Sequence, residues 1–255
     1  MCDAIQYLVQ IDIPFVTIEK KNLAPTMIFE RGILPQNRNN HIESYLTKGY
    51  ILDPLYQSIF KGYAPGFYHL KELAPDNFYQ SEYYKVFYKQ TGLLEDVYYI
   101  AYLKSNSMVS MSLSRNRNKL PFNDRELQVL KAIEPVVLSF LKRHFESISS
   151  QHDMLDVSQV KLHEHLKTAS INFGQSVLTQ RESEIVQLML RGHSVKSTAN
   201  DLNISIDTVK SHRKNLYEKL EISSQTELFL LFFDSLSFEK HSKDSDPLVA
   251  YRNSL

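Results

Sequence analysis

Residues 178–228 constrain the fold more than any other part of the chain, because three helix starts follow one another within them. Thr179 and Glu182 have the S/T-x-x-E spacing of a capping box, in which each side chain accepts a hydrogen bond from the backbone amide of the other residue. Ser194 and Ser205 are hydroxyl residues of the kind that cap helices, and each precedes apolar residues at helical spacing. The pattern predicts three helices in close succession.

The two residues between these predicted helices favour tight turns. Gly192 follows the first helical pattern, where glycine is the usual residue that ends a helix. Asn203 stands between the second and third helices, and asparagine tolerates a positive φ better than any residue except glycine. A short helix, a tight turn and a longer helix are typical of a helix-turn-helix that binds DNA.

The third predicted helix has two different faces. At about 100° per residue, Val209, Leu216 and Leu220 fall on one side, while Asp207, Lys210, Ser211 and Lys214 fall on the other. Such a helix packs on a small core and presents its polar side to the major groove, with phosphate contacts from its flanks. The residues expected to bind DNA are Lys196, Thr208, Lys210, Ser211, Arg213, Lys214 and Asn215.

This region resembles the LuxR/NarL-type helix-turn-helix over about residues 178–233. The positions that carry the resemblance are Leu178, Thr179, Arg181, Glu182, Gly192, Ala199, Leu202, Ser205, Thr208, Val209, His212, Lys219 and Leu220. Thr198 and Asn203 depart from the isoleucine and glycine that the family usually has there. The resemblance implies that Lys210, Ser211 and Lys214 reach base edges and that a homodimer binds an inverted repeat. Double-stranded DNA, a second copy of the chain and RNA polymerase are the partners considered.

Residues 228–233 are six consecutive apolar residues, which is more than one buried helix face requires. A subunit interface would cover the excess, and the dimerisation residues expected on this basis are Leu228, Phe229, Phe232 and Phe233. The alternative is a helix that is fully enclosed within one chain.

The whole-chain composition limits the classes of protein that the chain can be. It has 255 residues, enough for two domains, and its 29 basic and 29 acidic residues give a formal net charge of zero. Attraction to DNA is therefore local, on Lys210, Arg213 and Lys214. Cys2 is the single cysteine, which excludes an intrachain disulfide and a cysteine-based metal site, and no cofactor or metal is expected. Neither a membrane-spanning run nor a signal pattern occurs, so a cytoplasmic protein is expected.

The chain predicts an α+β fold with four parts. Residues 1–147 are expected to form a PAS/GAF-like α/β sensor domain, 148–176 a connector, 177–236 an all-α four-helix LuxR-type domain, and 237–255 a flexible tail. Within the first part, the patterns predict strands at 16–20 and 26–30, a hairpin from 97–104 and 107–115, helices at 39–49, 53–63 and 81–92, and a long helix at 125–145.

Tyrosine and phenylalanine crowd residues 45–102, which is typical of an aromatic small-molecule pocket or, more plainly, of a core. Residues 45–70 are weakly similar to the acyl-homoserine-lactone-binding domain of LuxR-type receptors around its Asp-Pro motif. The resemblance places Asp53 at the ligand amide and Tyr68 where the family often has tryptophan, which this chain lacks. The candidate ligand contacts are Tyr45, Tyr50, Asp53, Tyr56 and Tyr68. The alternative for Asp53 is a helix cap ahead of Pro54.

Two functions remain open at this stage. The first is a ligand-responsive regulator of transcription that binds DNA as a dimer. The alternative is an interaction protein that uses the helix-turn-helix and residues 228–233 to bind another transcription factor. No catalytic motif supports an enzyme, and the pair His163 and His165 lacks the i, i+4 spacing of a helical zinc site, so a solvated connector is expected there.

Overall fold

The computed structural model describes residues 1–21, 23–60, 62–104, 107–151, 157–236 and 246–254. The chain divides into two compact units. The sheet unit consists of Met1–Leu73 and Tyr88–His163, and the helical unit of Ala74–Phe87 and Glu164–Leu255. The last of the three boundaries, after His163, falls within a helix, α7 (Val157–Asn172). The short segment 74–87 belongs to the helical unit although the sheet unit precedes and follows it in the sequence.

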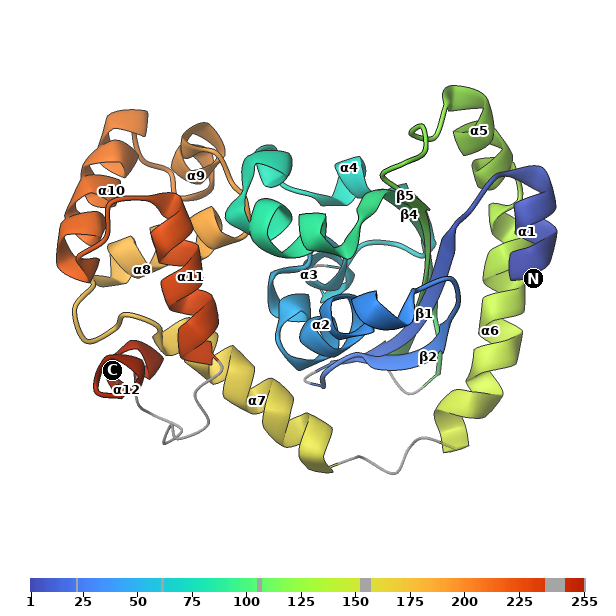
Figure 1. Ribbon diagram of the computed structural model, residues 1–255, viewed down its shortest axis with the longest axis horizontal. Helices are drawn as coiled ribbons and strands as arrows, with labels where there is room; N and C mark the ends of the chain where they lie inside the picture. Colours follow the sequence, from blue (N-terminus) through green and yellow to red (C-terminus); the bar gives the residue numbers. More distant parts are fainter. Residues whose placement is uncertain (22, 61, 105–106, 152–156, 237–245, 255) are drawn as a thin grey trace. The chain divides into compact units, whose positions relative to one another are not determined.

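The sheet unit contains a five-stranded antiparallel sheet with the strand order β2-β1-β5-β4-β3 (Figure 1). The strands are β1 (Ile13–Lys20), β2 (Thr26–Glu30), β3 (Gly66–His69), β4 (Leu93–Tyr102) and β5 (Ser107–Asn116). The strands expected at 16–20 and 26–30 and the pairing of the expected hairpin are confirmed, while its turn at residues 105–106 lies outside the described residues. Strand β3 and the first helix, α1 (Cys2–Leu8), were not predicted.

Strand register sorts the side chains of the sheet into two contrasting faces. Thr17 pairs with Ser110, and Ser114 pairs with Asp96, so these four side chains point to the same side. Their neighbours along the strands, such as Val16 and Met111, point to the opposite side. One face is therefore apolar and the other is rich in hydroxyl and carboxyl groups, and both are buried.

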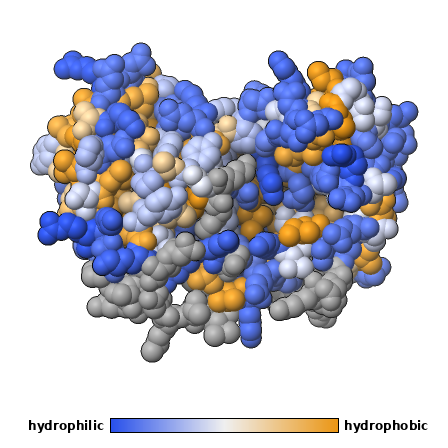
Figure 2. All heavy atoms as spheres, turned by 180° about the vertical axis from the view of Figure 1, so that it is seen from behind, coloured by the Kyte–Doolittle hydropathy of each residue, from blue (hydrophilic) through white to orange (hydrophobic). Residues whose placement is uncertain are grey.

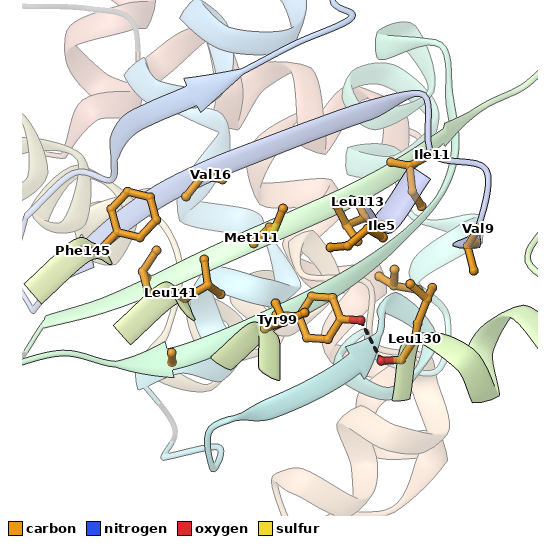
Figure 3. Packing of buried hydrophobic residues seen from close by; sticks show 14 of the residues in the cluster. Ile5, Val9, Ile11, Val16, Tyr99, Met111, Leu113, Leu130, Leu141 and Phe145 are labelled. Atoms are coloured by element: carbon orange, nitrogen blue, oxygen red, sulfur yellow. Dashed lines mark hydrogen bonds between the residues drawn. The ribbon is translucent and has the colours of Figure 1, made fainter. Parts of the chain in front are cut away.

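The apolar face packs against α1, α5 (Asp124–Ala132) and α6 (Glu134–Gln151), as Figure 3 shows. Val109, Met111 and Leu130 in this core are fully buried. The Tyr99 hydroxyl, buried among them, donates a 2.7 Å hydrogen bond to the Leu130 carbonyl oxygen. That bond satisfies the one polar group that this ring brings into the apolar layer.

The long helix expected at 125–145 is divided into two helices. Asn123 caps α5 through a capping box with Glu126, as the sequence predicts. The break falls at Ile133, immediately before Glu134 and Pro135. A proline in the first turn of a helix costs nothing because that amide has no helical partner, whereas in a helix interior it removes a hydrogen bond, so Pro135 starts a new helix.

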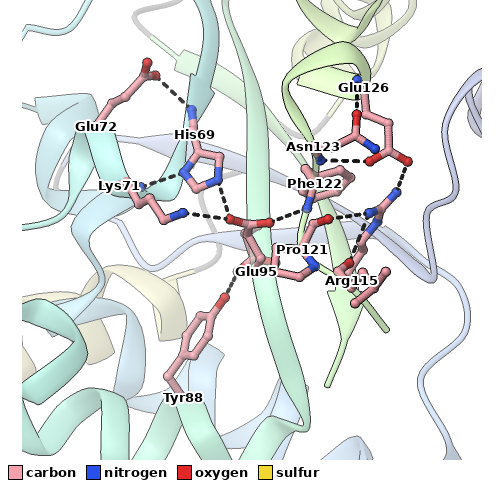
Figure 4. A network of polar contacts seen from close by, with 12 residues as sticks. His69, Lys71, Glu72, Tyr88, Glu95, Arg115, Pro121, Phe122, Asn123 and Glu126 are labelled. Carbon is pink, nitrogen blue, oxygen red and sulfur yellow. Dashed lines mark hydrogen bonds and ion pairs between the residues drawn. The ribbon is translucent and has the colours of Figure 1, made fainter. Parts of the chain in front are cut away.

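A polar network joins the end of the sheet to the start of α5 (Figure 4). The buried Glu95 carboxylate accepts hydrogen bonds from His69 Nε2 at 2.6 Å, Lys71 Nζ at 3.3 Å and the Phe122 amide at 2.7 Å. Burial raises the pKa of Glu95, but these donors outweigh it and lower the pKa to about 2. Arg115, also buried, donates to the carbonyl oxygens of residues 10, 120 and 121 and to Glu126.

Short helices cover the polar face of the sheet. They are a π-helical turn at Asn39–Glu43, α2 (Ser44–Thr47), a 3-10 turn at Gly49–Leu52, α3 (Pro54–Phe60) and α4 (Leu70–Leu73); a further 3-10 turn lies at Pro35–Asn37. The prediction of one continuous α-helix at 81–92 was wrong. A 3-10 turn at Phe78–Gln80, a π-helical turn at Tyr83–Phe87 and a 3-10 turn at Tyr88–Thr91 replace it. The buried Tyr83 and Tyr88 are five residues apart, which is the i→i+5 spacing of the hydrogen bond that defines a π-helix.

The helical unit contains α7, α8 (Gln180–Leu190), α9 (Val195–Asp201), α10 (Ile206–Leu220), α11 (Gln225–Leu236) and α12 (Pro247–Arg252). Helix α12 corrects the prediction of a flexible tail for the described residues 246–254; residues 237–245 lie outside the description. Asp246 caps α12 at the Leu248 amide and also accepts hydrogen bonds from Gly174 and Ser176. In the part of the chain that is described, no helix is long and apolar enough to cross a membrane.

Most of the apolar run on α11 is buried within the chain and is not the exposed surface that the expected dimerisation residues would need; the dimer contact itself stays a prediction. Leu228, Phe229 and Phe232 are at most 1% exposed, and Phe233, partly buried, stacks on Phe229. Phe173 makes an edge contact with Phe232 at 5.2 Å between ring centroids, and α12 packs along the helix. The chain therefore covers one face of this helix itself, while Leu230 remains 43% exposed, so the helix is not fully enclosed. On the face shown in Figure 2, apolar residues are interspersed with polar ones.

We predict that Phe232→Ala lowers the free energy of unfolding by about 3–5 kcal/mol, because it opens a cavity in the core of the helical unit. Leu230→Ala on the same helix is the control, since Leu230 is 43% exposed, and it should cost less than about 1 kcal/mol. Urea unfolding followed by circular dichroism measures both. Equal effects of the two variants would contradict the enclosed position of Phe232.

Candidate functional site

The helix starts of the helical unit form as the sequence predicts. Thr179 and Glu182 make a complete capping box at α8. Ser194 accepts from the Ser197 amide at the start of α9, and Ser205 accepts from the Thr208 amide at the start of α10. These caps fix where each helix begins, and therefore which side of α10 faces the core.

The two turns that connect these helices use left-handed backbone. Gly192 has φ +91° and Asn203 has φ +53°. At Gly192, an added Cβ would lie 3.0 Å from the Cα of Phe78, in the segment 74–87. Both the backbone conformation and the space at this position therefore require glycine.

Helix α10 presents a polar face to solvent. Val209, Leu216 and Leu220 are buried, whereas Lys210, Ser211, Lys214 and Asn215 are exposed. Lys210 lies 3.3 Å from Asp207 and Lys214 lies 3.8 Å from Glu218, in pairs whose side chains are all more than half exposed. Exposed pairs of this kind are worth at most about 1 kcal/mol, so a phosphate or a base edge can replace the carboxylate.

Three predicted DNA contacts lie at the margins of this face. Lys196 is exposed on α9, and Thr208 is half-buried, with its hydroxyl 2.8 Å from that of Ser205. Arg213 is half-buried. Its guanidinium lies over the ring of Tyr217, four residues later in α10, and donates to the Tyr217 hydroxyl at 3.3 Å. A cavity of about 260 Å³ lies beside it, with Asn77, Met189 and Val209 among its lining residues.

Lys219, near the end of α10, makes an ion pair within the helical unit. Its ammonium lies 2.6 Å from the carboxylate of Glu182, which is 3% exposed. Burial raises the pKa of Glu182, but the hydrogen bonds from Lys219 and Thr179 outweigh it, so the pKa is lowered. This pair ties α10 to the capping box of α8 and holds the polar face of α10 at a fixed angle to the core.

The segment 74–87 binds the start of α9 within the same unit. The Asp76 carboxylate accepts hydrogen bonds from the Ser194 amide at 3.0 Å, the Ser194 hydroxyl at 2.6 Å and the Ser197 hydroxyl at 2.8 Å. The Asn77 amide donates to the Gly192 carbonyl oxygen at 3.1 Å. Nothing in the sequence indicated this contact, because its partners are more than one hundred residues apart.

In the sheet unit, four of the five predicted ligand contacts meet in two pairs. Tyr45 donates to Asp53 Oδ2 at 2.7 Å, and Asp53 Oδ1 accepts from the Leu55 amide, so Asp53 caps α3 and meets a tyrosine at once. Tyr50 and Tyr56 are buried and meet edge to face, with their ring centroids 4.9 Å apart. Tyr68 bonds the Ala64 carbonyl oxygen, and its ring packs edge-on against Tyr63, which is itself 36% exposed.

His163 was expected in a solvated connector and is instead 5% exposed. Its Nδ1 lies 3.2 Å from the Tyr50 hydroxyl and 3.3 Å from the Tyr56 hydroxyl. The first turns of α7 therefore belong to the sheet unit, and a residue of this helix closes the aromatic pair.

Sequence reasoning missed the carboxyl groups that lie on the sheet itself. Glu19 is 1% exposed, and its Oε1 accepts from the hydroxyls of Thr17 and Ser110, each at 2.6 Å. Asp96 is also buried and accepts from Tyr88 and Tyr98. The alternation of polar residues in β5, at Ser110, Ser112 and Ser114, is the signal that could have revealed a polar buried face.

We predict that Lys219→Met destabilises the helical unit by about 1–3 kcal/mol at pH 7, because Glu182 stays buried and loses its charged donor. Glu182 has a lowered pKa in the folded state, so its pairing with Lys219 stabilises the fold fully at a pH above the ordinary pKa of glutamate. This stabilisation disappears as the pH falls through the pKa that Glu182 has in the folded state. Urea unfolding at pH 7 and in acid should show a difference only at pH 7. The control, Lys214→Met, removes a lysine that is 78% exposed and should have little effect.

Comparison with known proteins identifies the helical unit. Residues 176–232 match the family described as bacterial regulatory proteins, luxR family. A protein of Aeromonas salmonicida that is named as an HTH-type transcriptional regulator is 28% identical over 186 residues, which span 72% of this chain and 94% of that protein. The response regulatory protein YgeK of Escherichia coli is 38% identical over 88 residues, 34% of this chain and 58% of its own length.

Among solved structures, the VqsR LBD domain from Pseudomonas aeruginosa is similar at a TM-score of 0.48 and 20% identity, covering 56% of this chain and 83% of that one. The family match, the caps and the exposed polar face of α10 agree on the identity of the carboxyl-terminal part. Residues 176–232 form a helix-turn-helix domain of the luxR family of bacterial regulatory proteins.

Proposed function

We propose that this protein is a regulator of transcription that binds DNA sequence-specifically as a dimer and responds to a small molecule in its sheet unit. The observation that carries the proposal is the outer face of α10, where Lys210, Ser211 and Lys214 are exposed within a matched luxR-family domain. In a helix-turn-helix, the second helix of the motif lies in the major groove and its first turns contact base edges.

The roles of the residues follow from their positions. Lys210 and Lys214 are one turn apart and would donate to guanine acceptors or to phosphates, and Ser211 between them would tune base choice. Lys196 and Asn215 would contact the phosphate backbone on either side. The formal net charge of the chain is zero, so affinity rests on these local donors and falls steeply with salt.

The alternative, an interaction protein that uses residues 228–233, loses its main support because Leu228, Phe229 and Phe232 are buried within the chain. A second subunit needs another surface. Helix α6 supplies one, since Val136 and Phe140 lie one turn apart and are 72% and 45% exposed, and His144 continues the row by stacking on Phe140. We therefore place the dimer contact on this face of the sheet unit.

We predict that Lys210→Ala weakens binding to specific DNA by about 1–3 kcal/mol and relaxes the choice of base at one position of each half-site. The probe is a duplex selected from a random library with the unchanged protein, and fluorescence anisotropy measures the affinity. Lys142→Ala is the control, because Lys142 is an exposed lysine of the sheet unit and its loss changes the net charge equally. An unchanged affinity of the Lys210 variant would show that α10 does not enter the groove as assigned.

We predict that Phe140→Asp converts the dimer to a monomer, because a carboxylate in the centre of a small apolar contact would be buried without a partner. Light scattering coupled to size exclusion measures the mass. Leu120→Asp is the control, since Leu120 is 81% exposed in the sheet unit but distant in sequence from α6. A dimer that persists in the Phe140 variant would move the contact away from α6.

A further inference from the structure

The polar face of the sheet has more hydrogen-bond acceptors than donors. Thr17 and Ser110 both donate to Glu19 Oε1, while Glu19 Oε2 is buried and has no hydrogen-bond partner among the described residues. Each hydroxyl carries only one proton, so neither can supply a second bond. A buried carboxylate oxygen without a donor lowers the stability of the folded protein, because it has lost its hydrogen bonds to water and gained none in return. A bound molecule that donates a hydrogen bond to this oxygen would remove that cost.

The same imbalance recurs further along this face. Tyr88 and Tyr98 donate to Asp96 Oδ2, and Asp96 Oδ1 is buried without a partner among the residues that the structure describes. Tyr45 uses its proton on Asp53. The hydroxyl groups of Thr17, Ser110, Tyr88, Tyr98 and Tyr45 thus donate to carboxylates of the protein, and a molecule that approaches these carboxylates meets acceptors.

The charges on this face are not balanced by a lysine or arginine. Among the described residues, Arg115 is the only lysine or arginine that is buried. Arg115 follows Ser114 in β5, so it points to the apolar side of the sheet, where it bonds Glu126. Glu19 and Asp96, which are buried, and Asp53, which is half-buried, therefore lie on a face where the described residues include no buried lysine or arginine.

An aromatic pair lies at the end of the strand that holds Glu19. The Tyr56 hydroxyl donates a hydrogen bond to the Leu23 carbonyl oxygen at 3.1 Å, three residues beyond the end of β1. Tyr56 meets Tyr50 edge to face, with their ring centroids 4.9 Å apart. A carboxylate flanked by aromatic rings is a favourable environment for an organic cation, because the ring faces are electron-rich and attract ammonium groups.

We propose that the polar face of the sheet binds an organic amine, with an ammonium N–H donating to Glu19 Oε2 and the rings of Tyr50 and Tyr56 alongside. This inference rests on the proposed function, in which the sheet unit senses a small molecule, and it names the chemical class of that molecule. A neutral lactone brings mainly carbonyl acceptors, which would find the hydroxyl protons already committed. An amine brings both the donor and the positive charge that the face lacks.

The acidic groups titrate abnormally because they are buried, so near neutral pH the ligand-free form of Glu19 is mostly protonated and binding of an ammonium is coupled to the loss of that proton. Burial raises the pKa of Glu19 to about 8, although the hydrogen bonds from Ser110 and Thr17 oppose the rise and Asp53 adds to it. Burial likewise raises the pKa of Asp53 to about 6. A bound ammonium would favour the charged form of Glu19 and bring its pKa down.

The test compares amines with alcohols of the same shape on the full-length protein. The probes are butylamine and 2-phenylethylamine, and the matched uncharged compounds are 1-butanol and 2-phenylethanol. Isothermal titration calorimetry and thermal melting measure binding without DNA. We expect each amine to bind at least tenfold more tightly than its alcohol and to raise the melting temperature. Equal binding of amine and alcohol, or no binding of either amine, would overturn the proposal.

Two variants then locate the site. Glu19→Gln keeps an acceptor for Thr17 and Ser110 but removes the charge, and it should reduce the preference for amines to less than threefold. Glu43→Gln removes an exposed carboxylate of the same unit and should leave the preference unchanged. If Glu19→Gln keeps the full preference, Glu19 is not the partner. The comparison on the unchanged protein decides the ligand class even if this variant folds poorly.

The outcome is independent of the DNA experiment. Amine binding with no specific DNA binding would refute the proposed transcriptional role and leave the amine site standing. Specific DNA binding without any amine preference would refute the amine site and leave the DNA-binding role standing.

Discussion

The burial of both faces of one sheet is the constraint on which the sheet unit depends. The apolar face needs only close packing, which α1, α5 and α6 provide. The polar face must provide a hydrogen-bond partner for each buried polar group, because these side chains are shielded from bulk solvent. Its serines, tyrosines and carboxyl groups therefore bond one another, across strands for Ser110 and Glu19 and along one strand for Tyr98 and Asp96, and the buried oxygens without a donor among the described residues mark where the pairing is incomplete. The two sides of this sheet therefore differ: one is a close-packed apolar layer, and the other carries buried hydroxyl and carboxyl groups.

The helical unit depends on a different constraint, which is the rotation of α10 about its own axis, because this rotation decides which of its side chains face solvent. Serine and threonine caps set the first residue of α8, α9 and α10, and the Glu182–Lys219 pair ties the last turn of α10 to the start of α8. A rotation of α10 by one residue, about 100°, would carry Lys210 off the outer face. The polar bonds that fix this rotation all lie on the inner side or at the ends of the helix. The outer side chains can therefore vary without loss of the scaffold.

The sequence predicted what depends on neighbouring residues and missed what depends on distant ones. Capping boxes, the positive φ of Asn203 and the two faces of α10 are local patterns, and the structure confirms them. The burial of one face of α11 depends on α12, which the polar composition of the tail concealed. His163 was read as solvated because its aromatic partners lie more than one hundred residues earlier. The break before Pro135, by contrast, was local, and the rule for proline in helices was sufficient to predict it.

The path of the chain between the two units has a consequence for how such proteins can be recombined. The backbone passes from one unit to the other after Leu73, after Phe87 and after His163, and Asp76 and Asn77 contribute hydrogen bonds to the unit that holds the helix-turn-helix. A single cut in the sequence therefore cannot separate the units cleanly. Grafting residues 164–255 onto a foreign amino-terminal half would remove the hydrogen bonds that Ser194 and Ser197 donate to Asp76 and the one that the Gly192 carbonyl oxygen accepts from Asn77. The two halves of this chain have to be inherited together, as one linked piece, rather than shuffled as independent modules.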